Sequence, residues 1–496
     1  MSQGVVSVNV AVLLPVLAPA IGAAVILVAD VAAQRLRRAH YMVALASLVV
    51  GAVSTFSGLG MAAGDARQTL CLPGGGQCMY AGDSVASALQ LVALLAAAVT
   101  LLLSWPDDRK QATGGTAVIV SLVLAATAGA TAVAGARDLG SWLVSIELAT
   151  LPTVALVALR GARSAISGAV ALLTTSLVSF GLLALAAGLW FTATSSGFLT
   201  PAAALTVIDD PARRPILVLA VVLFVAGIGF KLSLVPFHAW TPEAYDGAPL
   251  PIAAFLAAVS KIAALAGLLV VIRAVAPLGA PVLTSIALVA AASMTLGNIM
   301  AMRQNNVVRL LAWSTVAQAG WVVMPLATVS SAAVRASGAY LLAYVLATLL
   351  AFAVVSALVQ IRGAVRARDL TGYRGLMRDH PVLGGALGLA LLSLAGLPPG
   401  VLGLVAKVTA LRPVVGSALW LLAVIAAANA VLGVAVYVRW LRALLAPPER
   451  GVDGAAAVVA RAVRVHPATL VAVGFAAVSL VLTSLSPQLI LGLMGS

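Results

Sequence analysis

Long runs of apolar residues, separated by short polar segments, fill this chain from one end to the other. About 20 consecutive apolar residues form a helix long enough to cross the hydrocarbon core of a bilayer. The pattern predicts fourteen such spans. They lie near residues 8–29, 41–62, 84–105, 115–135, 138–159, 165–191, 215–240, 250–272, 281–302, 307–328, 336–360, 381–411, 416–438 and 468–493.

The composition excludes a water-soluble fold. Of the 496 residues, 62% are hydrophobic and 9% are charged, whereas soluble domains have roughly 45–50% apolar and 25% charged residues. We therefore predict an all-α polytopic membrane protein embedded in the lipid bilayer. The formal net charge of +14 does not indicate nucleic-acid binding, because the basic residues sit in short loops and form no continuous patch. No basic region precedes the first apolar run, which is expected to be a first span rather than a cleaved signal peptide.

The distribution of Lys and Arg predicts how the chain is oriented. If the N-terminus lies outside, the cytoplasmic loops hold nineteen basic residues and the outer loops hold seven, as the positive-inside bias requires. The seven outer residues are Arg67, Arg137, Arg213, Arg214, Arg273, Arg335 and Arg412. Both termini are then expected outside.

With 25 Arg against 4 Lys and an Ala-rich composition, we expect a GC-rich bacterial genome and the bacterial plasma (inner) membrane.

The two cysteines, Cys71 and Cys78, lie in the second loop on the expected outer side, around a glycine turn. An oxidising compartment would allow them to pair, but their spacing alone leaves free thiols equally open. The sequence contains no CxxC motif or Cys/His cluster, so we expect no metal or redox centre in this chain.

Four ionisable residues lie inside predicted spans. Glu147 is in the fifth span, Lys231 in the seventh, Lys261 in the eighth and Lys407 in the twelfth, while the remaining lysine, Lys110, is in a loop. Each costs roughly 2.5–3.5 kcal/mol at the centre of a membrane helix. A purely structural role as helix anchors is the alternative, yet Lys differs from Arg in that burial can bring it to exchange protons near neutral pH. We therefore interpret these four residues as a proton-transfer site.

Prolines interrupt two of the spans that carry these lysines. Pro236 follows Lys231, and Pro398 and Pro399 precede Lys407. A proline inside a helix removes a backbone hydrogen bond, and interrupted helices in both halves of a chain are typical of inverted-repeat transporters. We predict two inverted five-helix repeats, made of spans 4–8 and 9–13. The expected divisions are 1–110 (spans 1–3), 111–275 (first repeat), 276–445 (second repeat) and 446–496 (span 14).

Two blocks of sequence resemble a known family. FKLSLVPFHAWTPEAYDGAPLP, from Phe230, and NIMAMRQNNVVRLLAWSTVAQAGWV, from Asn298, are similar to the antiporter-like subunit N family of the proton-pumping NADH-quinone oxidoreductase, respiratory complex I. The resemblance covers about residues 135–412. It implies that this chain translocates protons as a subunit of an NADH:quinone oxidoreductase. Its partners would be neighbouring antiporter-like subunits, and NADH, flavin, iron–sulphur clusters and quinone would bind in partner subunits, with no cofactor in this chain.

The resemblance also implies roles for individual residues. Glu147 would be the acidic partner that modulates Lys231, Lys261 the bridging proton carrier, and Lys407 the residue nearest the outward exit. Where relatives often carry His, this chain has Gln318, which we expect to orient water rather than titrate.

Three lesser signals leave alternatives open. His238 either helps protons to enter or satisfies backbone groups freed at the break, and we favour the structural role. Ser260 and Ser233, beside Lys261 and Lys231, either bond these lysines, hold water or bond their own backbone. Trp105, Trp190 and Trp240, near span ends, are expected to anchor at the membrane interfaces.

Two other functions stay open at this point. The first is a subunit of a multi-subunit cation/proton antiporter, which would share the lysine pattern. The second is a stand-alone carrier for an acidic solute, whose charge the lysines would neutralise.

Overall fold

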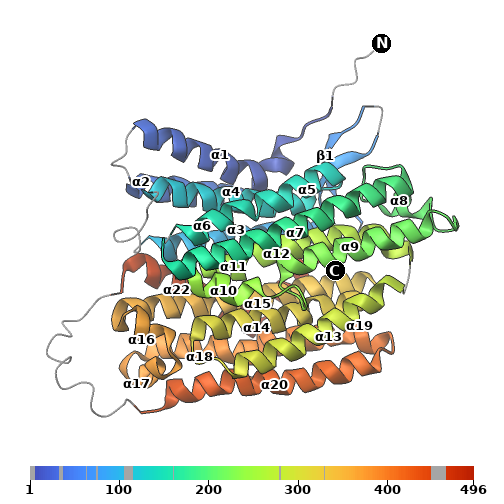
Figure 1. Ribbon diagram of the computed structural model, residues 1–496. Coiled ribbons are helices and arrows are strands. Elements are labelled where there is room, and N and C mark those ends of the chain that lie inside the picture. Colours follow the sequence, from blue (N-terminus) through green and yellow to red (C-terminus); the bar gives the residue numbers. More distant parts are fainter. Residues whose placement is uncertain are drawn as a thin grey trace.

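The computed structural model is a bundle of long helices that lie side by side (Figure 1). It describes residues 6–32, 37–62, 64–73, 76–105, 115–159, 161–278, 281–328, 330–447 and 465–495. The loop lysine, Lys110, lies outside the described residues. The prediction of an all-α polytopic membrane protein is confirmed.

The first half of the chain contains twelve helical segments. These are α1 (Val10–Ala32), α2 (Arg37–Thr55), α3 (Ser84–Ser104), α4 (Gly115–Gly135), α5 (Leu139–Leu148), α6 (Leu151–Ala158), α7 (Arg163–Thr194), α8 (Pro201–Leu205), α9 (Arg214–Leu232), α10 (Trp240–Gly247), α11 (Leu250–Ala257) and α12 (Val259–Val275). The second half contains η2 (Ala276–Leu278), α13 (Pro281–Met302), α14 (Val307–Val323), η3 (Met324–Ala327), α15 (Ser331–Arg362), α16 (Ala364–Arg368), η4 (Leu370–Tyr373), α17 (Leu376–Asp379), α18 (Pro381–Ala395), α19 (Val401–Gly416), α20 (Trp420–Leu445), α22 (Pro467–Leu485) and α23 (Gln488–Leu493).

Thirteen helical stretches among the described residues are long and apolar enough to cross a membrane. Each coincides with one of the predicted spans. The remaining predicted span, 381–411, is divided between α18 and α19, and these pieces have only 15 and 16 residues. The chain is therefore a multi-pass membrane protein whose twelfth span is made of two short helices.

Both predicted breaks are present and have the same local form. In both helices the residue just after the last helical one is left-handed. This residue is Ser233 after α9, with φ 66°, and Gly396 after α18, with φ 78°. Three residues further along, Pro236 and Pro399 each follow a cis peptide bond. The two halves of the chain thus share one way of ending a helix at membrane depth, while the inverted repeats themselves stay a prediction.

Two further interruptions were not predicted. The fifth span divides into α5 and α6 around Thr150, immediately after Glu147, and the eighth divides into α11 and α12 at Ala258, three residues before Lys261. All four ionisable residues of the spans therefore lie close to a place where the helix is broken.

The helices at the centre of the bundle are almost completely covered by protein. The apolar windows of α11–α12, α14–η3 and α15 are 94%, 100% and 89% buried, whereas those of α7, α20 and α22 are 33% buried. The outer helices carry rows of exposed Leu, Val, Ile and Phe side chains, as expected for surfaces in contact with lipid. The polar residues of the centre are thus shielded from acyl chains.

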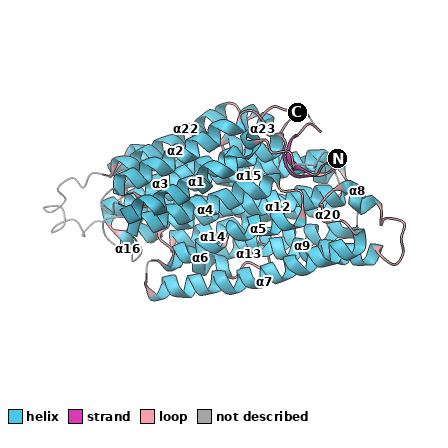
Figure 2. Ribbon diagram, turned by 90° about the horizontal axis from the view of Figure 1, so that it is seen from above, coloured by secondary structure: helices cyan, strands magenta, loops and turns pink. Residues whose placement is uncertain are grey.

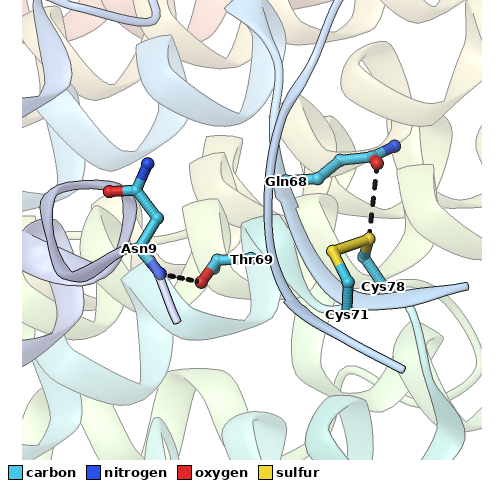
Figure 3. Close-up of a disulfide and its surroundings, with 5 residues drawn as sticks. All are labelled: Asn9, Gln68, Thr69, Cys71 and Cys78. Carbon is cyan, nitrogen blue, oxygen red and sulfur yellow. Dashed lines mark hydrogen bonds between the residues drawn. A yellow bond between two sulfur atoms is a disulfide. The ribbon is translucent and has the colours of Figure 1, made fainter. Parts of the chain in front are cut away.

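A disulfide-closed hairpin connects α2 to α3. Strand β1 (Arg67–Cys71) pairs antiparallel with β2 (Cys78–Gly82), and Cys71 faces Cys78 in this register. The two cysteines form a disulfide (Figure 3). The backbone N–H of Asn9 donates to the hydroxyl of Thr69 at 2.7 Å, which fastens the start of α1 to the hairpin. Both chain ends lie at the same end of the bundle as this hairpin, opposite α16 (Figures 1 and 2).

Candidate functional site

Glu147 and Lys231 form an ion pair between α5 and α9. The Lys231 Nζ lies 2.8 Å from Oε1 of Glu147, and the two side chains are 7% and 14% exposed. The same ammonium donates to Thr150 Oγ1 at 3.0 Å and to Ser176 Oγ at 3.4 Å. The Thr150 hydroxyl in turn donates to the Ile146 carbonyl at 2.9 Å. The three N–H donors of a lysine thus reach one carboxylate and two hydroxyls.

Lys261, on α12, binds the end of the helix that carries Lys231. Its Nζ donates to the backbone carbonyl of Lys231 at 2.9 Å and to Ser233 Oγ at 2.5 Å. The ammonium also lies over the Trp240 ring, 4.7 Å from its centroid. Within the part of the chain that the structure describes, no carboxylate pairs with Lys261. Its positive charge is therefore stabilised by a helix C-terminus and an aromatic face.

Lys407, on α19, has the corresponding environment in the second half. Its Nζ donates to the carbonyl of Ala395, the last residue of α18, at 2.5 Å, and lies 5.6 Å from the centre of the Trp321 ring. A Cβ at Gly396 would come within 3.0 Å of the lysine side chain, so this residue needs glycine for space as well as for its positive φ. Lys261 and Lys407 thus share one environment: each ammonium binds a backbone carbonyl at the C-terminal end of a broken helix and lies over the ring of a tryptophan.

A network of hydroxyls around Gln318 lies on the central helices α14 and α15. Gln318 Oε1 accepts from the Tyr340 hydroxyl at 2.5 Å, and Nε2 donates to the Tyr437 hydroxyl at 2.9 Å. Nearby, the hydroxyls of Thr315 and Tyr344 are 2.8 Å apart. The amide therefore bonds two tyrosines, and the expectation that it orients water stays a prediction.

A small cavity adjoins this network. It has a volume of about 10 Å³ and is lined by Gln318, Tyr340, Tyr344 and Ser393, with Gly403 and Ala406 of α19 on the far side. The Ser393 hydroxyl is buried and has no hydrogen-bond partner among the described residues. This space is about the size of one water molecule.

The remaining predicted residues lie at the breaks. Pro236, Pro398 and Pro399 form the non-helical segments after α9 and α18. The His238 ring lies 5.2 Å from that of Trp313, and its Nδ1 is buried without a partner among the described residues. A hydrogen bond between the His238 side chain and the Pro236 backbone agrees with the favoured structural role, bonding backbone groups freed at the break.

Of the two serines next to the lysines, Ser233 is the one whose hydroxyl Lys261 binds, while Ser260 is half-buried. The expectation about the tryptophans was wrong for two of them. Trp190 and Trp240 are buried, at 0% and 3% exposure, and so do not anchor at an interface. Trp240 instead donates from its indole nitrogen to the Phe230 carbonyl at 2.8 Å, which helps to hold the end of α9.

The tyrosines around Gln318 and the Thr150 partner of Lys231 were missed from the sequence. Tyr340 and Tyr344 are four residues apart on one helix face, so a polar stripe inside an apolar span was a signal that could have revealed them. Tyr437 and Thr150 carry no such signal, because they reach the site only through packing between distant segments.

The end of the bundle that carries the hairpin holds a second charged cluster. Asp83 Oδ2 lies 2.6 Å from Arg273 Nη1 and 3.5 Å from Arg137 Nη2. Burial alone would raise the pKa of Asp83, but the two guanidinium groups outweigh burial, and the pKa lies below its ordinary value. Burial lowers the pKa of Arg137. In the described ranges, no group of three or more His, Cys, Asp or Glu side chains is arranged to hold a metal ion.

Comparison with known proteins places this arrangement in a family. Residues 136–433 match the family model described as NADH:quinone oxidoreductase/Mrp antiporter, transmembrane. NADH-quinone oxidoreductase subunit N 2 of Streptomyces griseus is 36% identical over 445 residues, which are 87% of this chain and 81% of the relative. Subunit N of Salinispora tropica is 38% identical over 88% of this chain and 85% of its own length.

Two solved structures have the same overall fold. A chain of respiratory complex I from Thermus thermophilus with bound aureothin superposes with a TM-score of 0.76 at 30% identity, over 96% of this chain and 98% of that one. A chain of the Mrp complex from Dietzia sp. DQ12-45-1b superposes with a TM-score of 0.79, over 98% and 96%. Its identity of 19% supports the fold alone. From these matches, the chain belongs to the family of antiporter-like transmembrane subunits of NADH:quinone oxidoreductases and Mrp antiporters.

Proposed function

We propose that this chain is a proton-translocating subunit of an NADH-quinone oxidoreductase of the bacterial plasma membrane, with both termini outside. It would carry no redox centre and would respond to electron transfer from NADH to quinone in partner subunits. The similarity to two subunits N over more than four-fifths of both chains and the match to a complex I chain support this assignment.

One observation carries the proposed mechanism: Lys261 binds the backbone carbonyl of Lys231, which is itself paired with Glu147. Ion-pair attraction falls as the separation grows. A small movement of α5 away from α9 would therefore make it easier for Lys231 to give up its proton. Lys261, whose ammonium bonds the end of the same helix, is the nearest amine along the chain of contacts.

The second half of the path would run from Lys261 to Lys407. The hydroxyls of Tyr344 and Tyr340 and a water molecule in the 10 Å³ cavity are suitable proton carriers, since hydroxyls donate and accept at once. Gln318 would hold the tyrosines without taking a proton itself. Lys407 would then deliver the proton toward the outer side.

The test uses the assembled complex in sealed membrane vesicles. Lys231→Met, Lys261→Met and Lys407→Met are expected to lower proton pumping and NADH:quinone turnover. NADH oxidation by a water-soluble acceptor should stay unchanged, since that reaction needs only the redox centres of partner subunits. Full turnover with unchanged proton stoichiometry in all three variants would refute the proposed path.

A role in a cation/proton antiporter is the second candidate, because the family model and the fold include Mrp complexes. Deletion of the gene would then cause a sodium-dependent growth defect, and the chain would not co-purify with NADH-oxidising activity. No observation specifically favours a stand-alone solute carrier: the cavity beside Gln318, between Lys261 and Lys407 on the proposed path, has a volume of only about 10 Å³.

A further inference from the structure

A large cavity opens at the outer end of the bundle, away from the four ionisable residues. Its volume is about 530 Å³, within the ordinary range of ligand pockets. It lies between the start of α3, the end of α12, the start of α15 and the loop before β1. Its charged lining residues are Asp65, Asp83, Arg273 and Arg335.

Two of these four charges are already paired and two are not. Arg273 and Asp83 form the 2.6 Å contact described above. Arg335 and Asp65 make no ion pair or side-chain hydrogen bond with any other described residue, although both line the cavity. One cation and one anion therefore remain to face a ligand. A ligand that complements them carries one anionic and one cationic group.

The rest of the lining indicates an amphiphilic ligand. Apolar side chains form much of the wall, including Val85, Ile272, Leu326, Val334 and Met494. These residues stand at the ends of spans, at the depth where the polar headgroups of a bilayer meet its hydrocarbon core. A soluble zwitterion would leave this apolar surface uncovered, whereas a lipid would cover it.

The available donors favour phosphate as the anionic group. The Thr328 hydroxyl donates to the Pro325 carbonyl, whereas the Ser330 oxygen accepts from the Ala333 N–H and keeps its own O–H free to donate. Among the described lining residues, Arg335 is the cationic donor without an ion-pair partner, and its planar fork suits bidentate binding of phosphate. We propose that this cavity binds the headgroup of a zwitterionic phospholipid, with the phosphate on Arg335 and the ammonium on Asp65. The proposal does not depend on the proton path.

The experiment measures lipid binding to the intact, delipidated complex by native mass spectrometry. The probes are phosphatidylethanolamine, phosphatidylglycerol, and inorganic phosphate with free ethanolamine. The unmodified complex should prefer phosphatidylethanolamine. Arg335→Gln should weaken binding of both lipids by about tenfold, and Arg335→Lys, which keeps the charge, by less than that. Arg214→Gln, an exposed outer arginine remote from the cavity lining, is the matched control and should change nothing.

A second variant tests the opposite charge. Asp65→Asn removes the expected ammonium partner and keeps Arg335, so it should retain lipid but shift its preference to phosphatidylglycerol. Unchanged lipid retention in Arg335→Gln would overturn the site. Equal occupancy by inorganic phosphate and ethanolamine would overturn its assignment to a lipid. A density map of the assembled particle with a neighbouring subunit's polypeptide in the cavity would also overturn the proposal.

Discussion

The Glu147–Lys231 pair allows a quantitative test by a double-mutant cycle. At 2.8 Å and an effective dielectric constant of about 20, the two charges attract by about 6 kcal/mol. Removing both charges from water offsets much of this attraction. Removing only one partner leaves an uncompensated buried charge. We therefore expect Glu147→Gln and Lys231→Met each to lower the free energy of unfolding by about 3–5 kcal/mol.

The double variant Glu147→Gln, Lys231→Met should cost less than the sum of the two single variants, by about 3 kcal/mol. The assay is denaturant titration of the purified chain in detergent micelles, followed by tryptophan fluorescence. Glu243→Gln serves as the control, because its pair with Arg309, at 3.1 Å, involves a carboxylate that is 50% exposed. This control should cost below about 1 kcal/mol. Costs that add within about 0.5 kcal/mol in the double variant would refute the coupling.

Three other outcomes follow from the geometry. Lys261→Met should change the free energy of unfolding by less than about 2 kcal/mol, because the lost contacts offset the relief of a buried charge. The same variant should abolish proton pumping. A loss of stability without a loss of pumping would contradict this prediction. The pKa of Asp83 lies below its ordinary value, so its ion pairs stabilise the fold above about pH 4, and this contribution disappears as the pH falls further. Thermal denaturation from pH 6 to pH 3 should therefore show a loss of stability in the unmodified chain that Asp83→Asn does not show. Gly403→Ala should prevent correct folding, because its Cβ would lie 1.7 Å from the Ser393 carbonyl, whereas Gly416→Ala, in open space, should express normally.

The spans were predictable because bilayer thickness sets their length and lipid excludes charge. The same exclusion made Glu147, Lys231, Lys261 and Lys407 conspicuous without any structure. The breaks at spans 7 and 12 were predictable from proline, which cannot continue the hydrogen-bonding of a helix.

Other features were beyond sequence reasoning for physical reasons. The break at Ala258 has no nearby proline or glycine signal, since the preceding Pro251 lies at the start of α11. The partner of Lys261 is a backbone carbonyl, and carbonyls are present at every position. The sequence offered both Ser233 and Ser260 as partners of the lysines, but the choice of Ser233 for Lys261 depends on how α9 packs against α12. Such contacts depend on the packing of whole helices.

The hydrogen bonds at Ser233 link charge to shape. Its oxygen receives donors from Lys261, at 2.5 Å, and from Thr241 on α10, at 2.6 Å. A neutral amine still has two N–H groups, enough to keep both hydrogen bonds of Lys261, and gains a lone pair that the serine hydroxyl satisfies if it turns to donate. Displacement of α10, which draws Thr241 away, would make this turn easier. Motion of α10 would thereby change the cost of deprotonating Lys261 through a single rotating hydroxyl.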